Sequence, residues 1–125
     1  MANFLYKTLS FRILRIAFSV HNLLGPGLLE SAYEGAFCVE LTKAGIPFER
    51  QKVYPLYYKG EYIGGYIADL VVDNKIIVEL KSVSRLIPVM DAQTINYLHL
   101  SKRKVGYLMN FNAPRLQWKR FVNIR

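Results

Sequence analysis

Residues 66–81 read YIADLVVDNKIIVELK and carry more structural information than any other segment of the chain. Two runs rich in valine, isoleucine and leucine flank the turn sequence Asp73-Asn74-Lys75, which is the pattern of two β-strands joined in a hairpin. The pattern predicts strands at residues 66–72 and 76–81. Each strand also carries an acidic residue among its apolar neighbours.

The length of the turn decides whether the two acidic residues meet. Side chains alternate across a strand, so Glu79 and Lys81 face the same side. A two-residue turn at Asp73-Asn74 would place Asp69 opposite Val78 and send the two acids to different faces. A three-residue turn places Asp69 directly opposite Glu79. Burial favours the three-residue turn only weakly, so both registers are kept as alternatives.

With the three-residue turn, the two faces of the hairpin differ in composition. One face carries only apolar residues, namely Ala68, Leu70, Val72, Ile76, Val78 and Leu80. The other face mixes apolar and charged residues, namely Ile67, Asp69, Val71, Ile77, Glu79 and Lys81. Both faces have enough apolar surface to need covering, as in the central strands of a layered α/β protein.

Asp69, Glu79 and Lys81 together have the chemistry of a metal site. Two carboxylates that lie close together repel each other unless a cation joins them, and oxygen ligands suit Mg²⁺ or Mn²⁺. Lys81 would orient a water molecule or stabilise charge that develops on a phosphate. An exposed salt bridge between Lys81 and either acid explains the same residues without any chemistry.

The rest of the chain alternates between helical and extended patterns. Apolar spacing predicts helices at 8–24, 28–44 and 91–100, the first ended by Gly25-Pro26-Gly27 and the last capped by Asp91. Further strands are predicted at 52–59, 105–111 and 116–122, and Tyr62-Ile63 leads through Gly64-Gly65 into the strand at 66–72. The order is helix, helix, three strands, helix, two strands. At 125 residues, a single domain spanning 1–125 is expected.

The composition indicates a folded protein of a reducing compartment. Hydrophobic residues make up 52% of the chain, which excludes a disordered or collagen-like protein. The lone Cys38 cannot form an internal disulfide, and with His21 and His99 it falls short of the roughly four ligands of a structural zinc site. Arg12 and Arg15 interrupt the apolar run near the N-terminus, so no membrane span is expected. These features predict a cytoplasmic protein.

The charge raises the expectation of a polyanionic partner. The chain has 17 Lys and Arg against 9 Asp and Glu, a net charge of +8. No acidic residue follows Asp91, and basic residues gain affinity by displacing counterions from phosphates. The basic residues expected to contact nucleic acid, with DNA as the first choice, include Lys102, Arg103, Lys104, Arg115, Lys119 and Arg120. Basic ends that only keep a small domain in solution explain the same charge.

Several segments of this sequence resemble the GxxExxY proteins, a group assigned to the PD-(D/E)XK nuclease-like superfamily. They include LGPGLLESAYEGAF, ELTKAGIPFERQ, YYKGEYIGGYIADLVVDNKIIVELKSV, DAQTINYL and VGYLMNFNAPRLQWKRF. The naming motif corresponds to Gly27, Glu30 and Tyr33. The resemblance implies an α/β fold with a restriction-endonuclease-like core (αβββαβ), an extra N-terminal helix and a C-terminal strand.

The resemblance also implies roles for individual residues. Asp69 matches the metal-binding Asp of the superfamily, Glu79 the second acid, and Lys81 the lysine of the E-x-K element. Glu30 matches an extra acid that some branches, including Holliday-junction resolvases, place on the first core helix. Gln93 sits where related enzymes carry a helix residue near the site.

Simpler explanations exist for the residues outside the hairpin. Glu30 follows a helix-breaking cluster, and a carboxylate in a first helical turn is favoured by the helix dipole alone. Tyr33 is interpreted as a packing residue, and Gln93 fits a surface amide equally well. Ile67 stands where some relatives carry a basic residue, which removes a phosphate contact but leaves the metal site intact.

The sequence therefore leads to a metal-dependent nuclease hypothesis. Asp69, Glu79 and Glu30 would hold Mg²⁺ or Mn²⁺, Lys81 would assist, and the basic segments would grip the phosphate backbone without reading sequence. A homodimer would help so small a domain to span a duplex. The alternative is a non-catalytic module that keeps the nuclease fold and binds nucleic acid or protein. An amphipathic membrane-surface protein is a more distant alternative.

Overall fold

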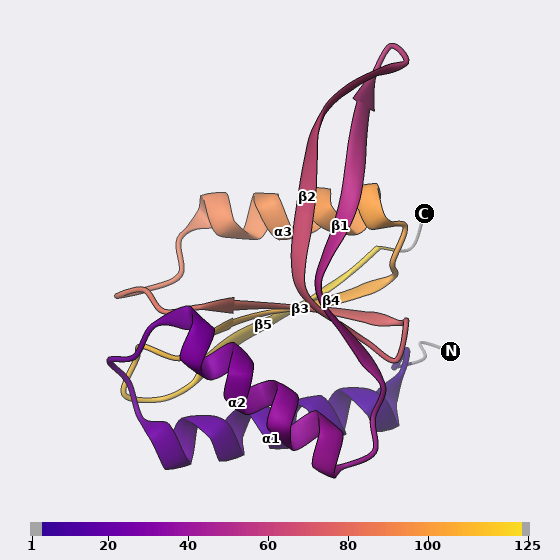
Figure 1. Ribbon diagram of the computed structural model, residues 1–125. Coiled ribbons are helices and arrows are strands. Elements are labelled where there is room, and N and C mark those ends of the chain that lie inside the picture. Colours follow the sequence, from indigo (N-terminus) through magenta and orange to yellow (C-terminus); the bar gives the residue numbers. More distant parts are fainter. Residues whose placement is uncertain (1–3, 124–125) are drawn as a thin grey trace.

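The computed structural model describes residues 4–123 as three helices and five strands. The elements are α1 (Lys7–Leu24), α2 (Glu30–Lys43), β1 (Phe48–Tyr58), β2 (Glu61–Val72), β3 (Ile76–Lys81), α3 (Pro88–Ser101), β4 (Val105–Asn110) and β5 (Gln117–Val122). The strands form one mixed sheet of order β1-β2-β3-β4-β5, in which only β3 and β4 are parallel. Helices α1 and α2 cover one face of the sheet and α3 covers the other (Figure 1). The predicted order of elements and the predicted α/β class are confirmed.

Differences from the predicted bounds lie at element ends. Strand β1 begins at Phe48, and the predicted strand began at residue 52. The prediction of Asp91 as a helix cap is wrong, because Ile87 is the N-cap residue of α3 and Pro88 opens the helix. Proline suits this first position because its fixed φ is helical and its missing N–H would have no partner there. Asp91 lies in the first turn instead, where its Oδ2 is 2.9 Å from Nζ of Lys119.

The turn between β2 and β3 contains three residues. Val72 pairs with Ile76 and Leu70 pairs with Val78, so the three-residue alternative is the observed one. Asp73 and Asn74 have φ values of 52° and 54°, in the left-handed region that short polar side chains tolerate better than other residues. Continuing this register along both strands brings Asp69 opposite Glu79.

The two faces of the hairpin are largely as predicted, with Ile67 and Ala68 as the exceptions. Ile67 was expected on the face of Val71 and Ile77, but it is 52% exposed and lies outside the core that contains them. The apolar face of the hairpin packs against α1 and α2 in the main core, to which Leu70, Val72, Ile76, Val78 and Leu80 contribute. Ala68 was expected on that face, but it lies in the smaller core with Tyr66 and Leu98 of α3. The pairing of β2 with β3 ends at Leu70↔Val78. Because β2 leaves β3 there and continues with β1 alone, the simple alternation of faces does not carry through Asp69.

Strands β3 and β4 form the rigid centre of the sheet. Every residue of β4 is buried, and so is every residue of β3 except Lys81, which is half-buried. Helices cover both faces of this parallel pair, as its continuous apolar composition requires. The E-x-K element at the end of β3 is therefore attached to the least exposed part of the molecule.

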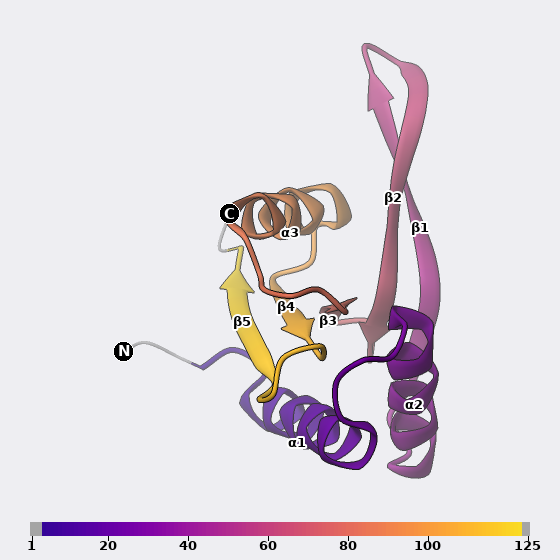
Figure 2. The same ribbon diagram turned by 90° about the vertical axis from the view of Figure 1, so that its left-hand side faces the viewer.

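The hairpin of β1 and β2 extends beyond the rest of the sheet. Its pairing runs from Phe48↔Val72 to Tyr58↔Glu61, whereas β3 pairs with only the last part of β2. In Figures 1 and 2 the far half of the hairpin stands clear of the other strands, beside α3. Stacked rings attach it there, because Tyr66 lies 5.8 Å from Tyr54 and 3.7 Å from Tyr97 of α3 between ring centroids.

The described residues contain no helix that is long and apolar enough to cross a membrane.

Gly65 allows the close approach of the hairpin strands, which predicts the effect of substituting it. A Cβ atom at Gly65 would lie 2.7 Å from the backbone oxygen of Tyr54, so Gly65→Ala should lower the free energy of unfolding by about 1–3 kcal/mol. Gly35→Ala is the matched control, because a Cβ atom there meets nothing within 4 Å. In helix α2 this change should raise stability by roughly 0.5–1 kcal/mol. Urea unfolding of both variants checks the opposite signs, and equal effects would contradict the packing described for Gly65.

Candidate active site

Asp69 and Glu79 lie where β2 separates from β3, and each carboxylate binds the opposite strand. Oε2 of Glu79 accepts the backbone N–H of Asp69 at 3.0 Å. Oδ2 of Asp69 in turn accepts the backbone N–H of Leu80 at 2.8 Å. The hydroxyl of Tyr66 donates a further hydrogen bond of 2.8 Å to Oε2 of Glu79. Side chains thus join the two strands just where their backbone pairing ends.

Burial raises the pKa of both carboxyl groups. Glu79 is only 6% exposed. Desolvation, together with the charge of Asp69, raises the pKa of Glu79 to about 8. Desolvation is also the main cause that raises the pKa of Asp69, with smaller contributions from Glu34 and Glu30. Without a cation at this position, the pair holds a proton near neutral pH, and a bound cation would take the place of that proton.

Lys81 stands beside the acidic pair at the end of β3. Its positive charge lowers the pKa of both Asp69 and Glu79, although less than burial raises them. The backbone oxygen of Lys81 accepts the N–H of Phe111 at 2.9 Å, which fixes the end of the strand. The end of β3 therefore brings a positive charge near enough to act electrostatically on both carboxyl groups.

Glu30 begins helix α2 and lies farther out. Its side chain is exposed, it occupies the first turn of the helix, and its charge raises the pKa of Asp69. Across residues 4–123, no three His, Cys, Asp or Glu side chains gather closely enough to enclose a metal ion. The structure brings Asp69 and Glu79 together and leaves Glu30 at the edge of the site. Two carboxylates still fit Mg²⁺, which usually keeps several waters and takes only one or two protein carboxylates.

The loop before Glu30 is tied to the end of β3. Ser82 donates to the oxygen of Leu28 at 2.6 Å, and Asn112 accepts the N–H of Gly27 at 2.9 Å. These residues and Glu30 line a groove of about 480 Å³. The groove is open to solvent, and of the candidate site residues Glu30 lines it, whereas Asp69 and Glu79 do not.

Tyr33 of the naming motif is a packing residue, as interpreted from the sequence. Its ring is fully buried and stacks on Phe111 with centroids 4.8 Å apart. Its hydroxyl donates to the oxygen of Gly25 at 2.6 Å and accepts the N–H of Leu28 at 3.1 Å. Tyr33 therefore holds the glycine-proline-glycine loop that leads into Glu30.

Gln93 belongs to the exposed surface of α3. Its side chain is exposed on α3, and within the described chain it makes no hydrogen bond to Asp69 or Glu79. The structure does not bring it into contact with the acidic pair.

Three residues at the site were not singled out from the sequence. Tyr66 binds Glu79, and the buried Glu34 and the neighbouring Gln51 lie on the side of Asp69. Glu34 follows Glu30 by four positions, and that helical spacing could have indicated a second acid on the same face. No sequence spacing indicated Tyr66 or Gln51 in this way. Tyr66 of β2 contacts Glu79 of β3, and Gln51 of β1 contacts Glu34 of α2, so each contact joins separate elements of the chain.

The basic residues expected to bind nucleic acid are spread over the molecule. Lys102 and Lys104 precede β4, at the end of the sheet opposite to Lys81. Arg103 donates to Asn74 at 2.7 Å, and Arg120 donates to Ser10, Tyr107 and Leu5. Lys119 is paired with Asp91, and Arg115 is exposed in the loop after β4. The six residues therefore do not form a single surface.

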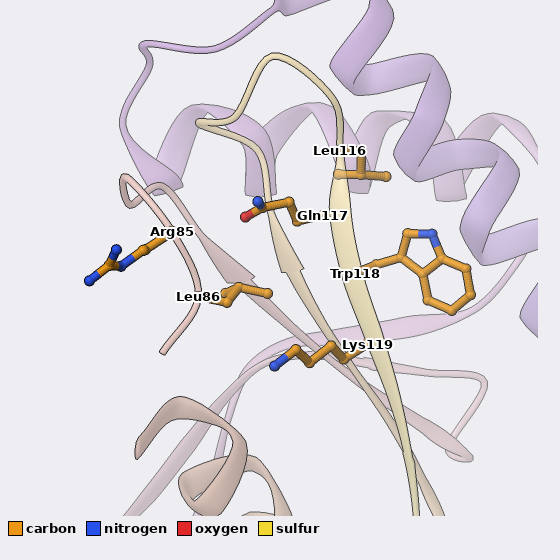
Figure 3. A pocket seen from close by; sticks show the side chains of 6 residues that line it. All are labelled: Arg85, Leu86, Leu116, Gln117, Trp118 and Lys119. Atoms are coloured by element: carbon orange, nitrogen blue, oxygen red, sulfur yellow. The ribbon is translucent and has the colours of Figure 1, made fainter. Parts of the chain in front are cut away.

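A second groove of about 430 Å³ lies between β5 and the 82–87 loop at the same end of the sheet as Lys81. Figure 3 shows Arg85 and Lys119 directed to one side of β5 and Trp118 to the other. Lys81 pairs with Asn110, and Asn110 pairs with Gln117 in this groove. Arg85 therefore contributes a positive charge to this groove, whereas the charge of Lys119 is already paired with Asp91.

Two solved structures share this fold at low sequence identity. The crystal structure of SSO0001 is 17% identical, with a TM-score of 0.53 over 94% of this chain and 62% of that one. An alkaline exonuclease from Laribacter hongkongensis is 10% identical, with a TM-score of 0.53 over 98% of this chain and 72% of that one. This chain thus spans less than two thirds of the length of SSO0001. At such identities both similarities describe the fold alone.

The family is settled by the sequence profile. No curated protein matches the chain significantly. The profile of the PD-(D/E)XK nuclease superfamily matches residues 7–121, and the two-stranded split that carries Asp69, Glu79 and Lys81 falls within it. Assignment to the GxxExxY branch stays a prediction. The chain belongs to the PD-(D/E)XK nuclease superfamily.

Proposed function

We propose that this protein hydrolyses phosphodiester bonds of nucleic acid, with a divalent metal ion held by Asp69 and Glu79. The observation that carries the proposal is the acidic pair near Lys81, in which Glu79 is buried, Asp69 is half-buried, and each carboxylate accepts a backbone N–H of the opposite strand. Placing two carboxylates close together in a site with little solvent is unfavourable for folding, and a bound cation offsets that cost. Membership of a nuclease superfamily, whose enzymes generally use divalent metals, supports the same function.

The hydrogen bonds of the pair leave oxygens free to bind a cation. Both hydrogen bonds that Glu79 accepts are made by Oε2, so within the described chain Oε1 has none. In Asp69, Oδ2 binds Leu80, while Oδ1 has only Gln51 at 3.5 Å. Asp69 and Glu79 would therefore hold Mg²⁺ or Mn²⁺ with Oδ1 and Oε1, and the exposed Glu30 would contribute through water.

The remaining residues would bind and orient the phosphate. A bound divalent ion supplies an activated water and a Lewis acid for the phosphoryl oxygen. Lys81 would donate to a non-bridging phosphate oxygen or to the attacking water. Its positive charge would then stabilise the negative charge that develops on the phosphate in the transition state. Arg85 would attract the backbone on the far side of Lys81. We propose DNA as the substrate to test first.

A module that binds nucleic acid without cutting it is the second candidate. The lack of a third enclosed acid within residues 4–123 favours it. The raised pKa of Glu79 weighs against it, because a scaffold gains nothing from a buried acid that resists ionisation. A metal-independent, salt-sensitive interaction with DNA would support this candidate.

The first prediction concerns cleavage. Purified protein with Mg²⁺ or Mn²⁺ should cut DNA, and Lys81→Ala should lower the rate by roughly 10²–10³-fold, the usual effect of losing one group that stabilises transition-state charge. Lys75→Ala is the matched control, because this lysine precedes β3 at the end of the strand opposite to Lys81. The change in rate is measured on labelled oligonucleotides. Equal rates for wild type and Lys81→Ala would contradict the proposed site.

The second prediction concerns stability and pH in metal-free protein. The pKa of Glu79 is about 8 in the folded state and 4.5 as an ordinary value, so the folded protein holds a proton that the unfolded chain has lost. Stability should therefore fall as pH rises from about 5 to 9, and the raised pKa of Asp69 acts in the same direction.

Glu79→Gln provides the control for this pH dependence. Glutamine can still accept the hydrogen bonds from Tyr66 and Asp69 but does not ionise. In EDTA this variant should keep a Tm that depends less on pH, and above pH 8 it should melt at a higher temperature than wild type. Mn²⁺ should raise the Tm of wild type, more at pH 8 than at pH 6, and leave the variant nearly unchanged. If the Tm of wild type and of Glu79→Gln changed with pH in the same way, the assignment of the raised pKa to Glu79 would be refuted.

A further inference from the structure

Gln51 has an unusual backbone conformation for a residue within a strand. Its φ is 53°, in the left-handed region. Of the non-glycine residues with positive φ in the described part of the chain, Gln51 alone lies inside a strand, whereas Lys59, Asp73 and Asn74 lie in turns. Glutamine gains nothing locally from this conformation, so other contacts must impose it.

The conformation interrupts the pairing of β1 and β2 opposite Asp69. Arg50 pairs with Leu70 and Lys52 pairs with Ala68, but the position between them makes no pair. The register is the same on both sides of the gap, so no residue has been inserted. The irregularity is a change in the direction of the chain at Gln51, directly beside the candidate metal ligand.

The side chain of Gln51 joins Asp69 to a buried acid of helix α2. Its Nε2 atom donates to Oε1 of Glu34 at 2.7 Å and lies 3.5 Å from Oδ1 of Asp69. Glu34 is 7% exposed, and its Oε2 accepts Nε of Arg50 at 2.6 Å. Two consecutive residues of β1 therefore bind the same carboxylate.

A regular strand could not make both of these contacts. Consecutive side chains of a strand point to opposite faces, so Arg50 and Gln51 would diverge. The left-handed backbone at Gln51 lets both side chains reach Glu34. Arg50 alone would already neutralise Glu34, and that ion pair requires no unusual backbone. What the left-handed conformation adds to this ion pair is the placement of the Gln51 amide between Glu34 and Asp69.

We propose that Gln51 is a positioning residue for the metal ligand Asp69, with Glu34 as its support. The backbone N–H of Leu80 holds Oδ2 of Asp69, and the Gln51 amide limits the position of Oδ1. The carboxylate is thereby prevented from rotating away from Glu79. This inference rests on the proposed metal site, and the experiments below separate the failure of one from the failure of the other.

Two substitutions at Gln51 separate the amide from the backbone conformation. Gln51→Gly and Gln51→Ala both remove the amide, but only glycine adopts a φ of 53° without strain. Gln51→Gly should melt about 4 °C above Gln51→Ala. Both should bind Mn²⁺ roughly 10–100-fold more weakly than wild type in calorimetric titrations, which is the usual effect of removing a group that orients a ligand. Wild-type Mn²⁺ affinity in Gln51→Gly would overturn the inference.

A double-mutant cycle tests the support from Glu34. Glu34→Ala removes the partner of the Gln51 amide, so its loss of Mn²⁺ affinity should match that of Gln51→Gly, and the double variant should bind no more weakly than either. Glu34→Gln keeps an acceptor oxygen for the amide and should retain most of the affinity. If the two losses of Mn²⁺ affinity added in the double variant, Glu34 would not act through Gln51, and its proposed role as the support of Gln51 would be overturned.

These titrations do not depend on turnover. A wild-type protein that binds Mn²⁺ and cuts no nucleic acid would refute the proposed function, and the affinities of the variants would still decide the role of Gln51. Cleavage by wild type with unchanged Mn²⁺ affinity in every variant would refute the role of Gln51 and leave the proposed function standing.

Discussion

The exchange of hydrogen bonds between Asp69 and the Glu79-Leu80 segment is the interaction on which the site depends. Where β2 leaves β3, each strand would expose unpaired backbone groups at the edge of the core, which is costly. The two carboxylates accept those backbone N–H groups instead. The strands can therefore separate at this point without leaving these N–H groups unpaired. One oxygen of each carboxylate stays available to bind a cation there.

The surroundings of the pair explain why it can be held in an unfavourable state. Glu79 extends from β3, in which every residue except Lys81 is buried. The hydroxyl of Tyr66 donates a hydrogen bond to Glu79, and the ring of Tyr66 is stacked on Tyr97 of α3. A buried carboxyl group resists ionisation, and the nearby Lys81 offsets only part of that effect. The chain as a whole carries a charge of +8, so the site is a small acidic region in a basic protein. This combination suits a cation and a polyanion that bind together.

Much of the fold could be predicted from local patterns, and the departures have identifiable causes. The strand at 76–81 was predicted with its observed bounds, because its apolar run ends at turn residues on one side and at the E-x-K element on the other. Ile67 and Ala68 were assigned to the wrong faces, because strand alternation assumes regular pairing, and the pairing of β2 with β3 ends at Leu70 while that with β1 is interrupted opposite Asp69. Glu34, Gln51 and Tyr66 were missed because their significance arises from contacts between elements that are separate in the chain.

The order of elements, the class of fold and the two acids and the lysine of the hairpin can be read from the chain, because periodicity and turn chemistry are local properties. The register of the turn, the point where β2 and β3 separate and the place of Glu30 at the edge of the site follow from the folded structure alone. The folded structure also decides that Gln51 takes a left-handed backbone conformation to reach Glu34. The physical reason is that hydrogen bonds across elements outweigh the local preference of a single residue, and no neighbouring residue in the chain announces them.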